Sequence, residues 1–250
     1  MTNRVREIER RISNLSEGQV ALLESIIDTF SQPIASHRNP SSDVVSQEFL
    51  AAFGDILKLH HSLSDDYLDK YRFEAAMQRV FRALGHDAVR PSRCNPGHDL
   101  TVDGVKWSLK TQGDASIKRD VLHISKFMEL GKGKWENEDD LPGLRNRFLH
   151  HLRTYDRILQ LRYFSQPESS SAHHSYELVE IPKPVLIEAQ NGVFQMMVES
   201  KQSPKPGYCT VTDSDGTVQF KLYFDGGTER KLQIKNLRKD LCVVHASWEF

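Results

Sequence analysis

Asp99 and Lys110, on either side of a tight turn, have the residue types and spacing for chemistry. The pair Asp103-Gly104 separates two runs of alternating apolar and polar residues, which predicts a β-hairpin with a two-residue loop. In this register Asp99 lies opposite Ser108, and Lys110 is its diagonal neighbour on the same face. The pattern predicts a carboxylate and an ammonium close together. An exposed cross-strand ion pair is the alternative interpretation.

Such a pair could cleave a phosphodiester. Carboxylate oxygens are ligands that hard divalent cations prefer. A nearby lysine can orient or deprotonate a water molecule and offset phosphate charge. Together with Mg²⁺, the pair would form a metal-dependent hydrolytic site.

Helices and strands around the hairpin must position these two groups. An apolar stripe predicts a helix over 64–84, which ends at Gly85. A second helix is predicted over 144–155, followed by strands at 157–164 and 176–181. The order is typical of helices packed on a β-sheet.

The two ends of the chain differ in pattern. The first sixty residues are helical in pattern, interrupted by a linker rich in Ser, Pro and Asn at 31–42. Residues 114–135 are mixed in pattern. The last fifty residues predict four strands, at 208–213, 218–224, 231–234 and 241–248. We predict an α+β fold (an α/β sandwich), with a mixed central β-sheet flanked by helices, an N-terminal helical region (1–62), and a core with a C-terminal β-rich region (63–250).

Composition excludes several classes of protein. The 250 residues are 38% hydrophobic and 27% charged, and no apolar run reaches the roughly 20 residues of a membrane span. The charged start lacks a secretory signal, so a cytoplasmic location is expected. The three distant cysteines form neither a disulfide framework nor a zinc signature. The histidine pairs at 150–151 and 173–174 lack zinc partners and are predicted to lie on the surface or in loops.

Basic residues are concentrated in two segments although the net charge is −1. Residues 105–135 hold seven Lys or Arg against three Asp or Glu, and residues 221–239 hold six against two. Clusters of this kind favour a polyanionic partner, with a solvated surface as the alternative.

The segment Asn95-Pro96-Gly97-His98-Asp99, followed by Ser108-Leu109-Lys110, resembles the motif of the PD-(D/E)xK nuclease superfamily. The helix containing Tyr71-Arg72-Phe73-Glu74 resembles the first core helix of that superfamily, which often supplies another metal-binding acid. More specifically, the chain resembles type II restriction endonucleases that cut the blunt palindrome CCCGGG. This resemblance covers roughly residues 45–250 and is carried by Asn95–Lys110, Ile124–Trp135, Tyr176–Lys183, Lys201–Tyr208 and Leu222–Lys235.

The resemblance implies a restriction-endonuclease-like fold and a Mg²⁺-dependent, sequence-specific cleavage of double-stranded DNA. The products would carry 5′-phosphate and 3′-hydroxyl ends. It also implies a homodimer on the palindrome, with a monomer that nicks the two strands in turn as the alternative. A prokaryotic cytoplasmic location and a cognate DNA methyltransferase that is not a subunit are implied as well.

One position departs from the family pattern. The superfamily places a second acid two residues before its lysine, and this chain has Ser108 there. Glu74, the side chain of Gln112 or the backbone carbonyl of Leu109 could replace that acid. We favour Glu74 because a metal site needs negative charge more than another neutral oxygen. The predicted catalytic residues are Asp99, Lys110 and Glu74, and the predicted metal ligands are Asp99, Glu74 and Leu109.

Basic and aromatic residues in three segments are candidates for contacts with phosphates and bases. The predicted DNA-binding residues are His123, Ser125, Lys126, Lys205, Tyr208, Arg230 and Lys231. Because Ser108 is a poor metal ligand, the alternative function is a catalytically inactive nuclease-fold protein that binds DNA. A structural protein that neither cuts nor binds DNA is a third possibility.

Overall fold

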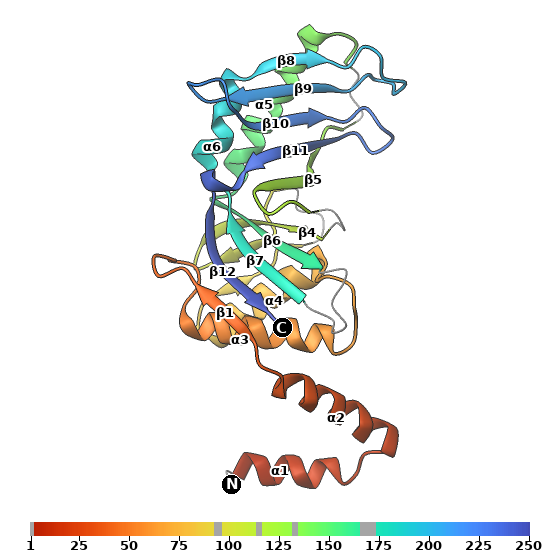
Figure 1. Ribbon diagram of the computed structural model, residues 1–250, viewed down its shortest axis with the longest axis vertical. Coiled ribbons are helices and arrows are strands. Elements are labelled where there is room, and N and C mark those ends of the chain that lie inside the picture. The colour runs from red at the N-terminus through yellow and green to blue at the C-terminus, as the bar shows by residue number, and fades with distance from the viewer. Residues whose placement is uncertain (1–2, 93–96, 114–116, 132–134, 166–173) are drawn as a thin grey trace.

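A computed structural model describes residues 3–92, 97–113, 117–131, 135–165 and 174–250. Two β-sheets, each with its own core, form the upper and middle parts of the molecule in Figure 1, and the first two helices lie below them. The prediction of an α+β fold with a mixed sheet is confirmed.

The seven-stranded sheet has the strand order β1-β12-β7-β6-β4-β3-β2. Its strands are β1 (Ala35–Arg38), β2 (Ala88–Val89), β3 (Leu100–Val102), β4 (Val105–Gln112), β6 (Arg157–Ser165), β7 (His174–Glu180) and β12 (Val243–Glu249). Strands β4 and β6 are parallel, and the other neighbours are antiparallel. A single parallel pair at the centre therefore makes the sheet mixed.

The second sheet is antiparallel throughout, with the order β5-β11-β10-β9-β8. Its strands are β5 (Val121–Glu129), β8 (Val193–Met196), β9 (Gly207–Thr212), β10 (Val218–Phe224) and β11 (Lys231–Arg238). The final strand β12 follows β11 in sequence but joins the first sheet, so the C-terminal β-rich region contributes to both sheets.

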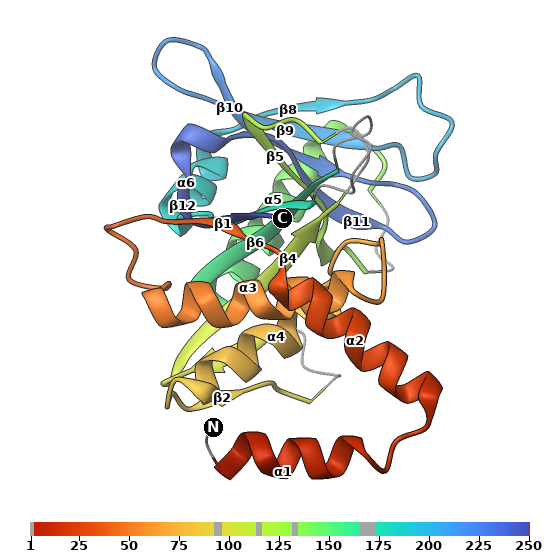
Figure 2. The same cartoon turned by 60° about the horizontal axis from the view of Figure 1, so that its bottom comes forward.

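Helices cover one face of the seven-stranded sheet, and the core of the second sheet meets its other face. Helices α3 (Gln47–His61) and α4 (Lys70–Ala83) lie side by side on one face (Figure 2), where their aromatic residues pack against Leu159 on β6. The neighbouring Ile158 points into the second core, which includes residues of α5 (Leu141–His151) and the short α6 (Lys183–Ile187). The alternation along β6 thus links the two cores.

Helix α4 begins later than its apolar pattern predicts. The Asp69 side chain accepts a hydrogen bond from the Arg72 amide at 2.8 Å and caps the helix. The preceding segment is held as a loop, because the Leu68 amide donates to the Tyr176 hydroxyl at 3.1 Å. The helix ends before Gly85, whose φ of +90° favours glycine.

The predicted hairpin register is confirmed. Strands β3 and β4 pair Leu100 with Trp107 and Val102 with Val105. Both turn residues have positive φ, as the two-residue turn between twisted strands requires. This register fixes where Asp99 meets β4.

The N-terminal helices α1 (Asn3–Ile12) and α2 (Glu17–Ser31) have no buried residue and project away from the sheets (Figure 1). The expected linker 31–42 is only partly a linker. Its residues Ala35–Arg38 form β1, which pairs with β12 at the sheet edge.

Among the described residues, no helix has the length and apolar character needed to cross a membrane.

Candidate active site

Asp99 lies just before β3 and is tied to β4 by several hydrogen bonds. Its amide donates to the Trp107 carbonyl at 2.8 Å, and its Oδ2 accepts from the Leu109 amide at 2.7 Å. Oδ2 also accepts from the Ser108 hydroxyl at 3.4 Å, while Oδ1 accepts from Lys70 Nζ at 2.8 Å. The carboxylate is therefore fixed in orientation by backbone and side-chain donors.

Glu74 comes from α4 and joins this group. Its carboxylate is 3.4 Å from Lys70 Nζ, and only 17% of its side chain is exposed. Burial raises the pKa of Glu74 above its ordinary value, while Lys70 acts against this shift. The Asp99 carboxylate acts in the same direction as burial, because a neighbouring negative charge disfavours ionisation of Glu74.

Lys110 lies on β4 beside these acids. Burial lowers the pKa of its ammonium to about 8, and the Asp99 carboxylate acts against that shift. For Asp99, burial is outweighed by Lys110 and Lys70, and the pKa of its carboxyl lies below 3.8. Among the described residues Lys110 forms no hydrogen bond or ion pair, and its Nζ lies 5.6 Å from the centre of the Phe127 ring.

These groups border an open cleft of about 800 Å³. The cleft is lined by Lys70, Tyr71, Glu74, Gln78, Arg90, Pro91, Ser92, His98 and Asp99. Arg90 lies 5.3 Å from the centre of the Tyr71 ring and donates to Gln78 at 3.1 Å. A cleft with acids at one side and an arginine at the other could receive a phosphate group.

The structure brings together the three predicted catalytic residues: Asp99 and Glu74 line this cleft, and Lys110 lies behind them on β4, where it senses the charge of both acids. Ser108 is buried and donates to Asp99. Leu109 contributes its amide to the same carboxylate. The fragment 95–96 of the motif lies outside the described residues.

Sequence reasoning missed Lys70, Arg90 and Tyr155. Lys70 is four residues before Glu74, a spacing that places both on one side of a helix, and this signal was available. Arg90 and Tyr155 reach the site region from separate segments, and nothing in the local pattern indicated this.

Two buried polar atoms in the segment 155–160, one of them on the register partner of Lys110, could take a further polar group. Among the described residues, the Tyr155 hydroxyl and Gln160 Oε1 have no hydrogen-bond partner. Gln160 is the register partner of Lys110 on β6, and burial, followed by Asp99, raises the pKa of Tyr155. Buried atoms of this kind are normally satisfied by water or a bound group. Two carboxylates with unsatisfied polar neighbours fit a hydrated divalent cation.

Two predicted DNA-binding loops lie against each other. Gln202 and Ser203 of the first loop and residues 226–230 of the second line a shared cavity of about 680 Å³. Gly226 allows this approach, because a Cβ there would collide with the Pro204 carbonyl oxygen. The Trp135 indole donates to the Lys205 carbonyl at 2.7 Å and supports the first loop.

The remaining candidates lie on the second sheet. Lys126 Nζ is 2.8 Å from Glu229, which also ion-pairs with Lys231 at 3.2 Å. Tyr208 packs against Tyr223, with ring centres 5.0 Å apart.

His123 and Ser125 lie on β5. The His123 carbonyl accepts from Gln160 at 2.7 Å, and Ser125 is exposed. The backbone of His123 is therefore bonded to the strand neighbour of Lys110.

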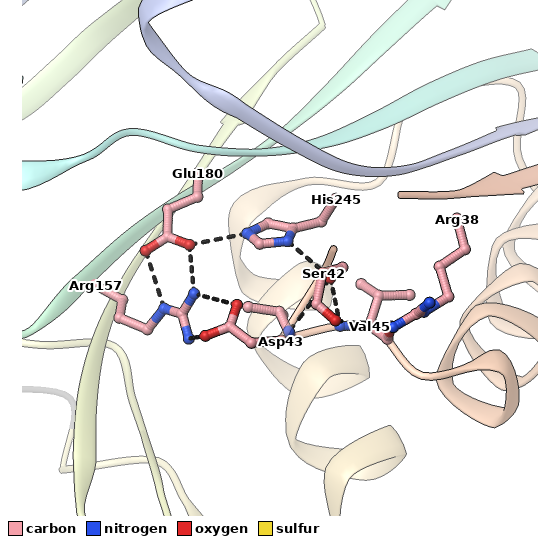
Figure 3. Close-up of polar contacts among 8 residues, drawn as sticks. Arg38, Ser42, Asp43, Val45, Arg157, Glu180 and His245 are labelled. Atoms are coloured by element: carbon pink, nitrogen blue, oxygen red, sulfur yellow. Dashed lines mark hydrogen bonds and ion pairs between the residues drawn. The ribbon is translucent and has the colours of Figure 1, made fainter. Parts of the chain in front are cut away.

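Outside the cleft, Asp43, Glu180 and His245 place ligand-type atoms within 4.8 Å of one another (Figure 3). The spacing is compatible with a cation. Here, however, the Arg157 guanidinium contacts Asp43 at 2.8 Å and Glu180 at 2.5 Å. The His245 ring links Glu180 to Ser42, with a distance of 2.8 Å on each side. The Arg157 guanidinium therefore supplies the positive charge that these acids need. The cluster also joins β6, β7 and β12 to the loop before α3.

Replacing Arg157 with methionine is expected to lower the free energy of unfolding by about 2–4 kcal/mol, because it leaves two carboxylates without their cation. Burial would raise the pKa of Glu180, but the hydrogen bonds from His245 and Arg157 hold it below 4.5. This stabilisation is present above the unfolded-state pKa and is lost as the pH falls through the lower folded-state pKa.

Urea unfolding measured from pH 7 to pH 3 checks this prediction. The difference between wild type and Arg157→Met should shrink on acidification. Arg10→Met removes an exposed ion pair on α1 and should change stability by less than about 0.5 kcal/mol. An equal effect of both substitutions would contradict the prediction.

His174 corrects one prediction. It was expected on the surface or in a loop, but it is buried in β7. Its ring stacks on His61 with centres 3.6 Å apart and lies 3.0 Å from the Tyr163 hydroxyl. A packing role explains it without a metal.

Comparison with known proteins gives the family. The model of a family described as SmaI, type II site-specific deoxyribonuclease, matches residues 8–250. The chain belongs to this SmaI family. It is 46% identical over 216 residues to the type II restriction enzyme SmaI of Serratia marcescens, which covers 86% of this chain and 85% of that protein. No solved structure matches the chain.

Membership of the SmaI family confirms the prediction of a type II restriction endonuclease, a hydrolase that cleaves double-stranded DNA sequence-specifically. It favours this function over the inactive DNA-binding protein. Type II restriction enzymes generally use a divalent metal ion, and the acidic groups of this chain are compatible with one.

Proposed function

We propose that the chain hydrolyses DNA at the cleft with Asp99, Glu74 and Lys110 as its catalytic residues and Mg²⁺ as its cofactor. The supporting observation is that α4, the start of β3 and β4 bring two carboxylates and a partly buried lysine to one place. Asp99 and Glu74 would hold the ion, with the backbone carbonyl of Leu109 as a third candidate ligand. When bound, Mg²⁺ would polarise the scissile phosphate and offset its charge.

The residues of the chain carry the other steps. Lys110 orients the attacking water and, in its uncharged form, accepts a proton from it. Ser108 and the Leu109 amide fix the orientation of Asp99. In-line attack on phosphorus breaks the bond to the 3′-oxygen, which takes up a proton from water, and leaves 5′-phosphate and 3′-hydroxyl ends.

We propose CCCGGG as the target. The support is the identity to the Serratia marcescens enzyme, together with the resemblance in the segments that hold the two adjoining loops. A GC-rich site offers guanine O6 and N7 acceptors, which arginine and lysine contact in the major groove. Arg230, Lys231 and Lys205 are the proposed readers, while His123, Ser125, Lys126 and Tyr208 are proposed to contact the DNA nearby.

Digestion of plasmid DNA by the purified chain tests the function. With Mg²⁺ we expect discrete fragments, with EDTA none, and sequencing of the ends should show cuts inside CCCGGG. Discrete fragments cut elsewhere would reject the proposed target, whereas DNA binding without products would support the inactive alternative.

The proposed contact of Arg230 with DNA predicts that Arg230→Ala binds DNA more weakly. DNA affinity should fall by about 1–3 kcal/mol, because one charged contact to a base or phosphate is lost. Fluorescence anisotropy with a duplex in Ca²⁺, at several salt concentrations, measures the effect. The exposed Arg79→Ala on α4 is the matched control and should bind like wild type. Wild-type binding by Arg230→Ala would reject this contact.

We propose that the chain acts as a homodimer and that α1 and α2 form the contact. These helices expose apolar side chains and bury none: Val5, Ile8, Leu22, Ile27 and Phe30. Helix α1 has four arginines against two glutamates, whereas α2 has three acids and no base. The opposite charges favour α1 of one copy against α2 of the other. Sedimentation equilibrium of the full chain tests this assembly.

The proposed domain division gives the contact role to the N-terminal region (1–62) and the chemistry to the core (63–250). Within the first region, α3 nevertheless packs against α4. Because the proposed substrate is DNA, we propose that the protein acts in the cytoplasm of a bacterium. Because host DNA would contain the same target, we also propose that the cell holds a cognate methyltransferase.

A further inference from the structure

Lys70 holds both acids of the cleft. It is the first residue of α4, and its Nζ lies 2.8 Å from Asp99 Oδ1 and 3.4 Å from Glu74 Oε1. Among the described residues, it is the one lysine that ion-pairs with both of these carboxylates. The ammonium therefore lies at the oxygens to which a cation would bind.

A divalent ion and this ammonium compete for the same oxygens. With Asp99 and Glu74 ionised, Lys70 and Lys110 balance their two negative charges, and Arg90 adds a positive charge that acts on Glu74. Such a cluster attracts a cation weakly, whereas removal of Lys70 takes away the positive charge that lies at the two carboxylates. In the free protein, the ion pairs of Lys70 with Asp99 and Glu74 thus oppose the binding of a metal ion to these two acids.

Lys70 is also able to leave the acids. Its side chain is 46% exposed, in contrast to the 18% of Asp99. A lysine side chain is long and flexible, and its ammonium can donate to a phosphate as readily as to a carboxylate. Since Lys70 lines the cleft, a DNA phosphate in the cleft would offer it a new partner.

We propose that Lys70 is an internal counter-ion that holds Asp99 and Glu74 in the free protein and must be displaced for the divalent metal to bind. The inference rests on the proposed metal ligands. DNA, by taking the ammonium onto a phosphate, would raise the affinity for metal, so substrate and metal binding support each other. Lys70 is a positioning residue in this scheme.

Titration of Mn²⁺ into the full chain without DNA tests the proposal, with free Mn²⁺ measured by electron paramagnetic resonance. Lys70→Met should bind Mn²⁺ about tenfold more tightly than wild type, because a competing charge is gone. Lys70→Arg keeps the charge and should stay within about twofold. Arg72→Met, which removes a charge paired with the capping residue Asp69, should also stay within about twofold.

Equal or weaker Mn²⁺ binding by Lys70→Met would overturn the proposal. The Asp99→Asn variant separates this failure from failure of the proposed function. If Asp99→Asn abolishes Mn²⁺ binding while Lys70→Met leaves it unchanged, the proposed metal ligands are supported and only the counter-ion role of Lys70 is rejected. If binding persists fully in Asp99→Asn, the proposed ligands are wrong and the inference falls with them.

Thermal unfolding gives a second measurement. In EDTA, Lys70→Met should melt below wild type because two carboxylates lose their shared cation. Added Mn²⁺ should raise its melting temperature by more than it raises that of wild type. An equal or smaller increase would overturn the proposal even if the variant folds poorly without metal.

Discussion

Lys110→Ala should cleave DNA about 10²–10⁴ times more slowly than wild type, the usual loss when a group that transfers protons is removed. DNA affinity should stay close to that of wild type, because the ammonium is partly buried, beside Phe127, and does not line the cleft. Single-turnover cleavage with Mg²⁺ and anisotropy with Ca²⁺ measure the two quantities separately.

The lowered pKa of Lys110 also predicts how the cleavage rate depends on pH. Because burial lowers its pKa to about 8, the uncharged form increases as the pH rises through that value. The wild-type rate should therefore rise with pH and level off above about 8. Lys110→Arg, which keeps the charge but cannot release a proton, should stay slow at every pH.

The exposed Lys106 on β4 is the matched control. Lys106→Ala should cleave like wild type, since its side chain is exposed at the other end of the strand. Rapid cleavage by Lys110→Arg would show that Lys110 contributes charge and not proton transfer. Rapid cleavage by Lys110→Ala would remove the residue from the mechanism.

Asp99→Asn should also reduce cleavage by at least about a thousandfold, because it removes a charge from the proposed metal site. Asparagine keeps an oxygen to accept the Leu109 amide, so the fold should be preserved. Glu74→Gln should cause a loss of similar size if it supplies the missing second acid. Ser108→Ala should cost less than about tenfold, since its bond to Asp99 is long at 3.4 Å.

Mn²⁺ titrations and cleavage rates of these three variants distinguish the candidates for the second acid. A large loss for Ser108→Ala with little change for Glu74→Gln would contradict the assignment of Glu74. Near-ultraviolet circular dichroism checks that each variant folds. Full activity of Asp99→Asn would reject the site itself.

The strongest local signals predicted the structure well. The turn at Asp103-Gly104 fixed the hairpin register because only a primed two-residue turn suits that dipeptide between twisted strands. The apolar stripe of α4 predicted the helix, but its start at Lys70 and not at residue 64 depends on the contact of Leu68 with Tyr176 and on the cap at Asp69.

Features that depend on distant segments could not be read locally. Strand β5 was missed because register shifts against β11 interrupt its alternation. Strand β1 has four residues and exists through its pairing with β12, more than 200 positions away. A pattern within one short segment contains no information about such a partner.

The candidate site was predicted in part for the same reason. Asp99 and Lys110 come from one hairpin, so their spacing was sufficient. Glu74 required the packing of α4 on the sheet and was proposed from the resemblance. The ion pairs of Lys70 depend on both elements at once. The DNA-binding residues stay predictions.

The close approach of Gly226 to Pro204 has a consequence for attempts to redesign the target sequence. Any side chain at 226 would push the two loops apart, so neither loop can change shape alone. Randomising one loop would therefore mostly yield proteins with a damaged partner loop. Libraries that vary both loops together, with glycine retained at 226, offer a practical route to altered cutting.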